Sequence, residues 1–153
     1  MIRKKRNSGF TLVELMIVLV VIAIVASIAT MSGLAARVRT NEGSVLASLK
    51  TISVGAEMYL NNSTSYPADL LTLGSDYIPS DLVTGRKSGY TFELSTANSG
   101  ATFTVSAVPI SMNYTGVKSY CINNLNAIYV YQNAPALSAD GTNCPSGGNI
   151  LSA

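Results

Sequence analysis

The sequence predicts an α+β protein in which a long N-terminal helix packs on a C-terminal antiparallel sheet of about four strands. Three observations favour this fold. An apolar run extends from Phe10 to Met31, an apolar stripe of helical spacing continues to Tyr59, and short strand-like segments separated by turn residues follow residue 88. A chain of 153 residues has room for one small domain behind such a helix.

The apolar run carries one charged residue, Glu14. Eighteen or more apolar residues suffice for a transmembrane helix. A carboxylate inside such a segment costs about 2.5–3.5 kcal/mol on insertion scales, which indicates a function and a partner. The nearest possible partner is a cation that the uncut chain lacks, namely the α-amino group that cleavage between Gly9 and Phe10 would release.

The second half of the predicted helix is amphipathic. Its apolar residues recur at alternating spacings of four and three, which places them on one face: Val45, Leu49, Ile52, Ala56 and Tyr59. We expect the opposite side to be polar, with Asn41, Glu42, Ser44, Ser48, Lys50, Ser53 and Glu57. The two halves therefore read as one helix that ends near Asn61–Asn62. Gly33 costs only about 1 kcal/mol relative to alanine, so we expect at most a softening of the helix there.

A loop region is predicted over residues 61–81, where Tyr66-Pro67 and Ile78-Pro79 mark turns or extended chain. A short helical turn is expected within residues 68–77, held to the core by three leucines, Leu70, Leu71 and Leu73. Four strands are then predicted from β-branched and aromatic residues bounded by Gly, Asn, Ser or Pro: residues 89–95, 101–108, 116–122 and 127–132.

The N-terminus carries the strongest motif. A basic cluster at residues 3–6 precedes Gly9-Phe10-Thr11-Leu12-Val13-Glu14-Leu15 and the apolar run. This arrangement resembles the class III signal of type IV pilins and of the related pseudopilins of type II secretion. The resemblance implies that a membrane-embedded prepilin peptidase cuts after Gly9 on the cytoplasmic side and methylates the new amino terminus at Phe10. It also implies that Glu14 pairs with the amino group of a neighbouring subunit during assembly.

Two plainer interpretations of the same segment are an ordinary secretory signal and a plain membrane anchor. Small residues at 26–29 could serve a signal peptidase, but the apolar stretch exceeds the usual 7–15-residue core of such a signal. A plain anchor explains the length and the preceding positive charges. It does not explain Glu14 or the glycine before Phe10.

The resemblance divides the chain into a cleaved leader (1–9), a hydrophobic transmembrane and filament-core helix half (10–36), an amphipathic helix half (37–62) and a sheet-containing head (63–153). Four of the ten Lys and Arg residues lie in the leader, which leaves six against eight acidic residues, a side-chain balance of −2. Nothing in this balance indicates a nucleic-acid-binding surface.

Cys121 and Cys144 are the two cysteines. In a periplasmic or extracellular domain an isolated pair is most simply a disulfide, which would tie the weakly patterned tail (133–153) to the third strand. A metal site is not expected, because the chain has no histidine and no further cysteine. Calcium is not expected either, since the tail offers one carboxylate, Asp140. Major pseudopilins resemble one another in an acidic C-terminal calcium loop, so its absence favours a pilin.

The sequence therefore predicts a structural subunit of a type IV pilus. It predicts no enzyme and no cofactor, because the usual acid–base and nucleophilic groups cannot be assembled without histidine, a nucleophile elbow or clustered carboxylates. Its implied partners are further copies of the chain, the peptidase and methyltransferase, an inner-membrane assembly platform, an outer-membrane secretin, and lipid before assembly. It would wait in the inner membrane with the head in the periplasm and then enter an extracellular filament. The alternatives are a pseudopilin acting as a secretion piston and a membrane-anchored periplasmic binding domain.

Overall fold

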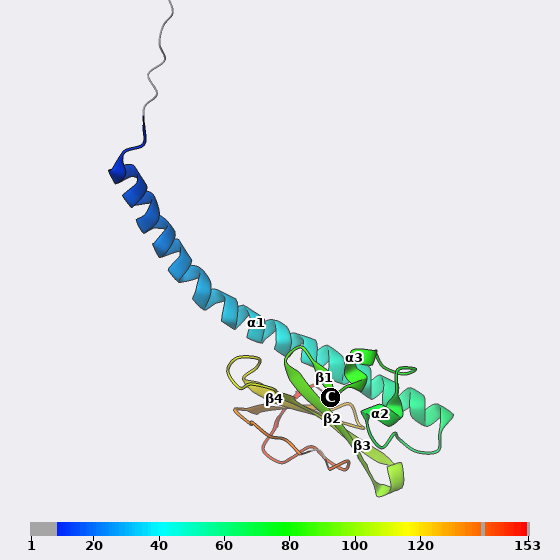
Figure 1. Ribbon diagram of the computed structural model, residues 1–153. Coiled ribbons are helices and arrows are strands. Elements are labelled where there is room, and N and C mark those ends of the chain that lie inside the picture. Colours follow the sequence, from blue (N-terminus) through cyan, green and yellow to red (C-terminus); the bar gives the residue numbers. More distant parts are fainter. Residues whose placement is uncertain (1–8, 139, 153) are drawn as a thin grey trace, which may run out of the picture. The chain divides into compact units, whose positions relative to one another are not determined.

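The computed structural model describes residues 9–138 and 140–152, with the backbone alone for 29–32 and 152. The basic cluster at residues 3–6 lies outside the described residues. The chain divides into two compact units, 1–36 and 37–153. Helix α1, Leu12–Asn62, begins in the first unit and ends in the second (Figure 1). It is long and apolar enough to cross a membrane.

Within the second unit, α1 buries the predicted stripe. Val45, Leu49, Ile52 and Ala56 have no exposed surface, and Tyr59 is partly buried against the same core. Two serines predicted to lie on the polar side, Ser48 and Ser53, are buried instead. They flank the stripe at helical spacing, and a core-facing stripe is 100° wide or more, so it includes them. The hydroxyl of Ser53 is accommodated there because its Oγ donates to Asn126 Oδ1 at 2.7 Å.

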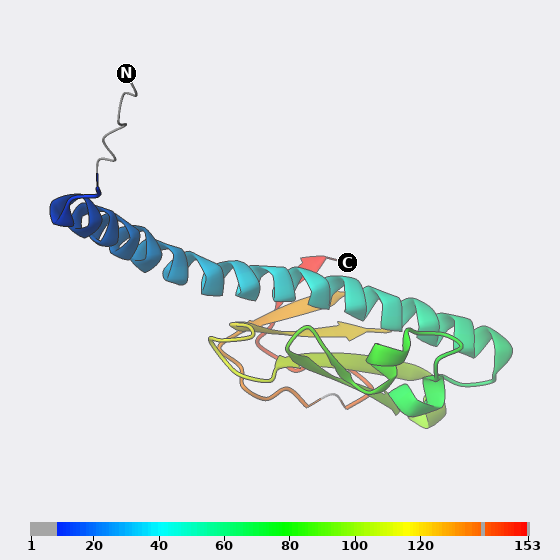
Figure 2. The same ribbon diagram turned by 45° about the horizontal axis from the view of Figure 1, so that its top comes forward.

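Within the described residues, the sheet has six antiparallel strands in chain order, not the four that were predicted. The strands are β1 (Arg86–Lys87), β2 (Tyr90–Ala97), β3 (Thr102–Pro109), β4 (Lys118–Asn123), β5 (Ile128–Gln132) and β6 (Asn149–Ser152). The four predicted strands correspond to β2–β5. The two additional strands are the edges, and both are too short to show an alternating pattern. Residues of α1 that belong to the second unit lie across one face of the sheet (Figure 2).

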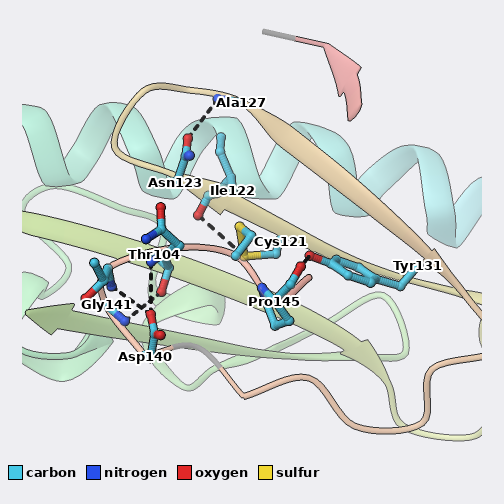
Figure 3. Close-up of a disulfide and its surroundings, with 12 residues drawn as sticks. Thr104, Cys121, Ile122, Asn123, Ala127, Tyr131, Asp140, Gly141 and Pro145 are labelled. Carbon is cyan, nitrogen blue, oxygen red and sulfur yellow. Dashed lines mark hydrogen bonds between the residues drawn. A yellow bond between two sulfur atoms is a disulfide. The ribbon is translucent and has the colours of Figure 1, made fainter. Parts of the chain in front are cut away.

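Strand β3 is buried on both faces. Phe103, Val105 and Ala107 have no exposed surface and belong to the core shared with α1. Thr104 and Ser106, which alternate with them, are buried as well. The C-terminal tail covers that second face, where the backbone N–H of Gly141 donates to Thr104 Oγ1 at 3.0 Å (Figure 3).

The described part of the second unit also contains three short helices: α2 (Leu70–Leu73), α3 (Ser80–Val83) and the 3₁₀ helix η1 (Asn98–Gly100). Helix α2 lies in the segment where a helical turn was predicted, whereas α3 occupies part of the predicted loop. Leu70 and Leu73 are buried as expected, but Leu71 is 73% exposed. A single helical turn presents only one side to the core, so three leucines in a row of four cannot all reach it.

A disulfide joins Cys121 on β4 to Cys144 in the tail, with 5.8 Å between the two Cα atoms (Figure 3). Close to it, the hydroxyl of Tyr131 donates to the carbonyl oxygen of Pro145 at 2.5 Å. Beyond these contacts the tail returns to the sheet as β6, which pairs with β5. The disulfide therefore fixes a segment in which most of the described residues are exposed.

We expect Cys144→Ser to destabilise the full-length protein by about 3 kcal/mol, because the cross-link no longer restricts the unfolded chain. Thermal unfolding of the detergent-solubilised protein, followed by circular dichroism, measures the loss. Asn143→Ser is the matched control, since it changes the neighbouring exposed side chain and keeps the disulfide. Equal melting temperatures of the Cys144→Ser variant and the unmodified protein would contradict the expected stabilisation.

The stability of the second unit should fall in alkaline solution. Burial, and then the hydrogen bond that the hydroxyl of Tyr66 donates to Glu57 Oε1 at 2.9 Å, raise the pKa of Tyr66 from 10.0 to about 12. Because the pKa of Tyr66 is higher in the folded chain than in the unfolded chain, the protonated phenol stabilises the folded state. This contribution to the free energy of unfolding is complete below pH 10 and is lost as the pH rises through about 12. Urea unfolding at pH 9–12 should show that decline, and Tyr66→Phe should make it shallower; an unchanged slope would contradict this assignment.

Candidate functional site

The candidate site is the segment from Gly9 to Glu14. Gly9, Phe10 and Thr11 precede helix α1, and the Phe10 side chain is 83% exposed. A Cβ atom added at Gly9 would meet no atom within 4 Å. The peptide bond between Gly9 and Phe10 therefore lies outside the helix and is not covered by the described part of the chain, as a peptidase substrate requires.

Thr11 and Glu14 cap the start of helix α1 through reciprocal hydrogen bonds. The Glu14 backbone N–H donates to Thr11 Oγ1 at 3.2 Å, and Thr11 returns two bonds to Glu14 Oε2, from its backbone N–H at 3.2 Å and from its hydroxyl at 3.0 Å. This is the capping-box arrangement, in which the cap hydroxyl and the carboxylate three residues later satisfy each other's backbone donors. It explains why the helix begins at Leu12 and not at Phe10, where it was expected.

The capping role of Thr11 was missed by the sequence reasoning, which treated Glu14 as an unpaired carboxylate. The signal was present, since Thr-x-x-Glu before an apolar run is the sequence form of a capping box. Glu14 Oε2 accepts both bonds from Thr11, whereas Glu14 Oε1 accepts none within the described part of the chain. One carboxylate oxygen thus serves the chain's own helix and the other is open to a donor from elsewhere.

The helix behind this cap is apolar all round. Every large apolar side chain from Leu12 to Val25 has at least 53% of its surface exposed. A helix that is apolar on all faces is stable only where lipid or other helices cover it. None of the most apolar stretch of α1 is buried by the chain itself.

The predicted site residues are divided between the two units. Gly9, Phe10 and Glu14 belong to the first unit, while the disulfide between Cys121 and Cys144 belongs to the second. Among the described residues, no group of three or more His, Cys, Asp or Glu side chains is placed to hold a metal ion. The chemistry that the segment supports is peptide-bond cleavage by another protein and charge pairing by Glu14.

A comparison with protein families finds a match at the N-terminus. Residues 4–30 match the family described as the prokaryotic N-terminal methylation motif. This match confirms the class III signal of the kind shared by type IV pilins and pseudopilins. No protein of curated function matches the chain.

Proposed function

We propose that this pilin-like chain is a structural subunit of a type IV pilus, cut after Gly9, methylated at Phe10 and polymerised through its N-terminal helix into a cell-surface filament. The observation that carries the proposal is the methylation motif over residues 4–30. The exposed apolar helix behind the motif supports it, because such a surface requires lipid or further helices.

Processing would change the charge of the segment. Hydrolysis of the peptide bond after Gly9 adds water across that bond and leaves a carboxylate on Gly9 and an amino group on Phe10. The leader carries four positive side chains away, and a new cation appears four residues before Glu14. Methylation transfers a methyl group from an electrophilic methyl donor to this nitrogen, which releases one proton, and the product is still a basic amine that is protonated at neutral pH.

Assembly would use this new charge. In the membrane, Glu14 is costly while it is unpaired, and an ammonium group of a neighbouring subunit offsets that cost. The free Glu14 Oε1 can accept from that group while Glu14 Oε2 keeps its bonds to Thr11. The surrounding apolar side chains of the two helices would then pack together where each had been in contact with lipid.

The organisation proposed for the chain follows from these steps. Residues 1–9 are the leader, 10–36 span the membrane and later form the filament core, 37–62 form the amphipathic helix half, and 63–153 form the head with its disulfide-tied tail. Before assembly the head would lie in the periplasm, and after assembly in the extracellular filament. The inner-membrane assembly platform and the outer-membrane secretin are the partners proposed for that transfer.

Electron microscopy of material sheared from the cell surface, with mass spectrometry of its subunit, tests this function. We expect long fibres whose subunit begins at methylated Phe10. A processed chain confined to the inner membrane, with no surface fibres, would contradict the pilus and favour the secretion pseudopilin. A full-length chain that is never processed, with a head that binds a small molecule, would contradict both and favour the membrane-anchored binding domain.

A further inference from the structure

Two grooves of opposite charge lie in the second unit. The first, here called the basic groove, has a volume of about 400 Å³ and lies between α1 and strands β4–β6. Its lining includes Arg39, Glu42, Leu46, Lys118, Val130 and Leu151. The apolar members of this set come from three different elements, so the groove combines aliphatic and charged side chains.

The basic groove has one cation without a partner. Glu42 is occupied locally, because its Oε2 lies 3.4 Å from Lys118 Nζ and its Oε1 accepts from the backbone N–H of Val117 at 3.2 Å. Arg39 is exposed and has no ion-pair partner within the described part of the chain. The groove therefore presents a free positive charge beside apolar surface.

The second groove, here called the acidic groove, has a volume of about 250 Å³ and is lined by residues of α2, α3 and β2, including Asp69, Leu71, Val83 and Glu93. The backbone N–H of Thr72 donates to Asp69 Oδ1 at 2.7 Å, which lowers the pKa of Asp69 and keeps it ionised. Glu93 is exposed on β2. Leu71, which the fold leaves 73% exposed, belongs to this groove.

One molecule cannot bring its two grooves together. The acidic groove lies on the β1–β2 side of the sheet and the basic groove on the β4–β6 side, and the strands follow one another in chain order. Their opposite charges and exposed apolar side chains make them complementary surfaces for two copies. Because the contact joins two different surfaces, repeating it builds an open chain of subunits and not a closed two-fold dimer.

We propose that the acidic groove of one copy docks on the basic groove of the next copy in the filament, with Leu71 entering between α1 and β6. Glu93 of the first copy then lies opposite Arg39 of the second. This inference rests on the proposed function, since it names a contact between heads in the same filament. The opposed charges set the orientation of the two heads, and burial of Leu71 removes apolar surface from water.

Cysteine cross-linking in filaments tests the contact. The double variant Leu71→Cys with Leu151→Cys should give, after mild oxidation, a ladder of covalent multimers on a non-reducing gel. The matched control replaces Leu71→Cys by Leu125→Cys, because Leu125 is 75% exposed and lies in neither groove. This control should give no more covalent multimer on the gel than the variants with a single introduced cysteine.

A charge exchange tests the same contact without new cysteines. Arg39→Glu and Glu93→Arg should each lower the filament yield about tenfold, and the variant that carries both should restore it. If fibres form but the cysteine variants give no covalent multimers and the double charge variant does not restore the filament yield, the contact is overturned and the proposed function stays in place. Failure of the unmodified processed chain to form fibres would overturn the proposed function and, with it, this contact.

Discussion

Replacing Glu14 by glutamine should reduce filaments below detection while leaving membrane insertion and cleavage after Gly9 unchanged. Glutamine at this position can still close the capping box with Thr11, so the start of α1 is preserved and only the charge is lost. Without the charge, the amino terminus of a neighbouring subunit gains no partner in the membrane. Immunoblots of the membrane fraction report cleavage, and shearing of surface filaments reports assembly.

Two companion variants separate the charge of Glu14 from its capping role. Thr11→Ala removes the cap and retains the charge; loss of an N-cap costs about 1 kcal/mol of helix stability, so filaments should form at reduced yield. Glu14→Ala removes the charge and the two bonds that Thr11 donates to the carboxylate, while the backbone N–H of residue 14 can still donate to Thr11 Oγ1. This variant should match the glutamine variant in assembly. Normal filaments from Glu14→Gln, together with loss of filaments from Thr11→Ala, would show that capping and not charge is the role of Glu14.

The helix and the central strands were predictable because each repeats a pattern over many residues. The stripe from Val45 to Ala56 and the alternation of Tyr90, Phe92 and Leu94 correspond to buried faces in the structure. Sequence periodicity reports one buried face, however, and β3 has two. Its second face is covered by a tail that has no pattern of its own, so the burial of Thr104 and Ser106 depends on tertiary contacts.

The edge strands and Leu71 were not predictable for related reasons. Strand β1 has two residues and β6 has four, which is too short for alternation, and β6 is positioned by its pairing with β5. The exposure of Leu71 depends on which side of α2 meets the core, and one helical turn contains too few residues to define that side. The leader motif, by contrast, was recognised from residue types at fixed spacing and required no knowledge of tertiary structure.

Gly9→Val should stop processing almost completely, so that the full-length chain accumulates in the membrane and no filaments form. A side chain added at Gly9 meets nothing within 4 Å, so the substitution leaves the chain's own fold intact and the loss arises in the peptidase site. Retention of the leader then keeps its four positive charges on the chain and prevents the amino group of Phe10 from forming. Intact-mass spectrometry of the membrane-extracted chain measures the retained leader directly.

The matched control for Gly9→Val is Gly33→Ala, which also adds a side chain where no atom lies within 4 Å. It lies inside α1, where alanine is favoured over glycine by about 1 kcal/mol, so this variant should be cut and assembled normally. If Gly9→Val still yields a chain that begins at Phe10, the peptidase does not require glycine at residue 9. A shortened chain with a different first residue would place the cut elsewhere and would also remove the proposed pairing between Phe10 and Glu14.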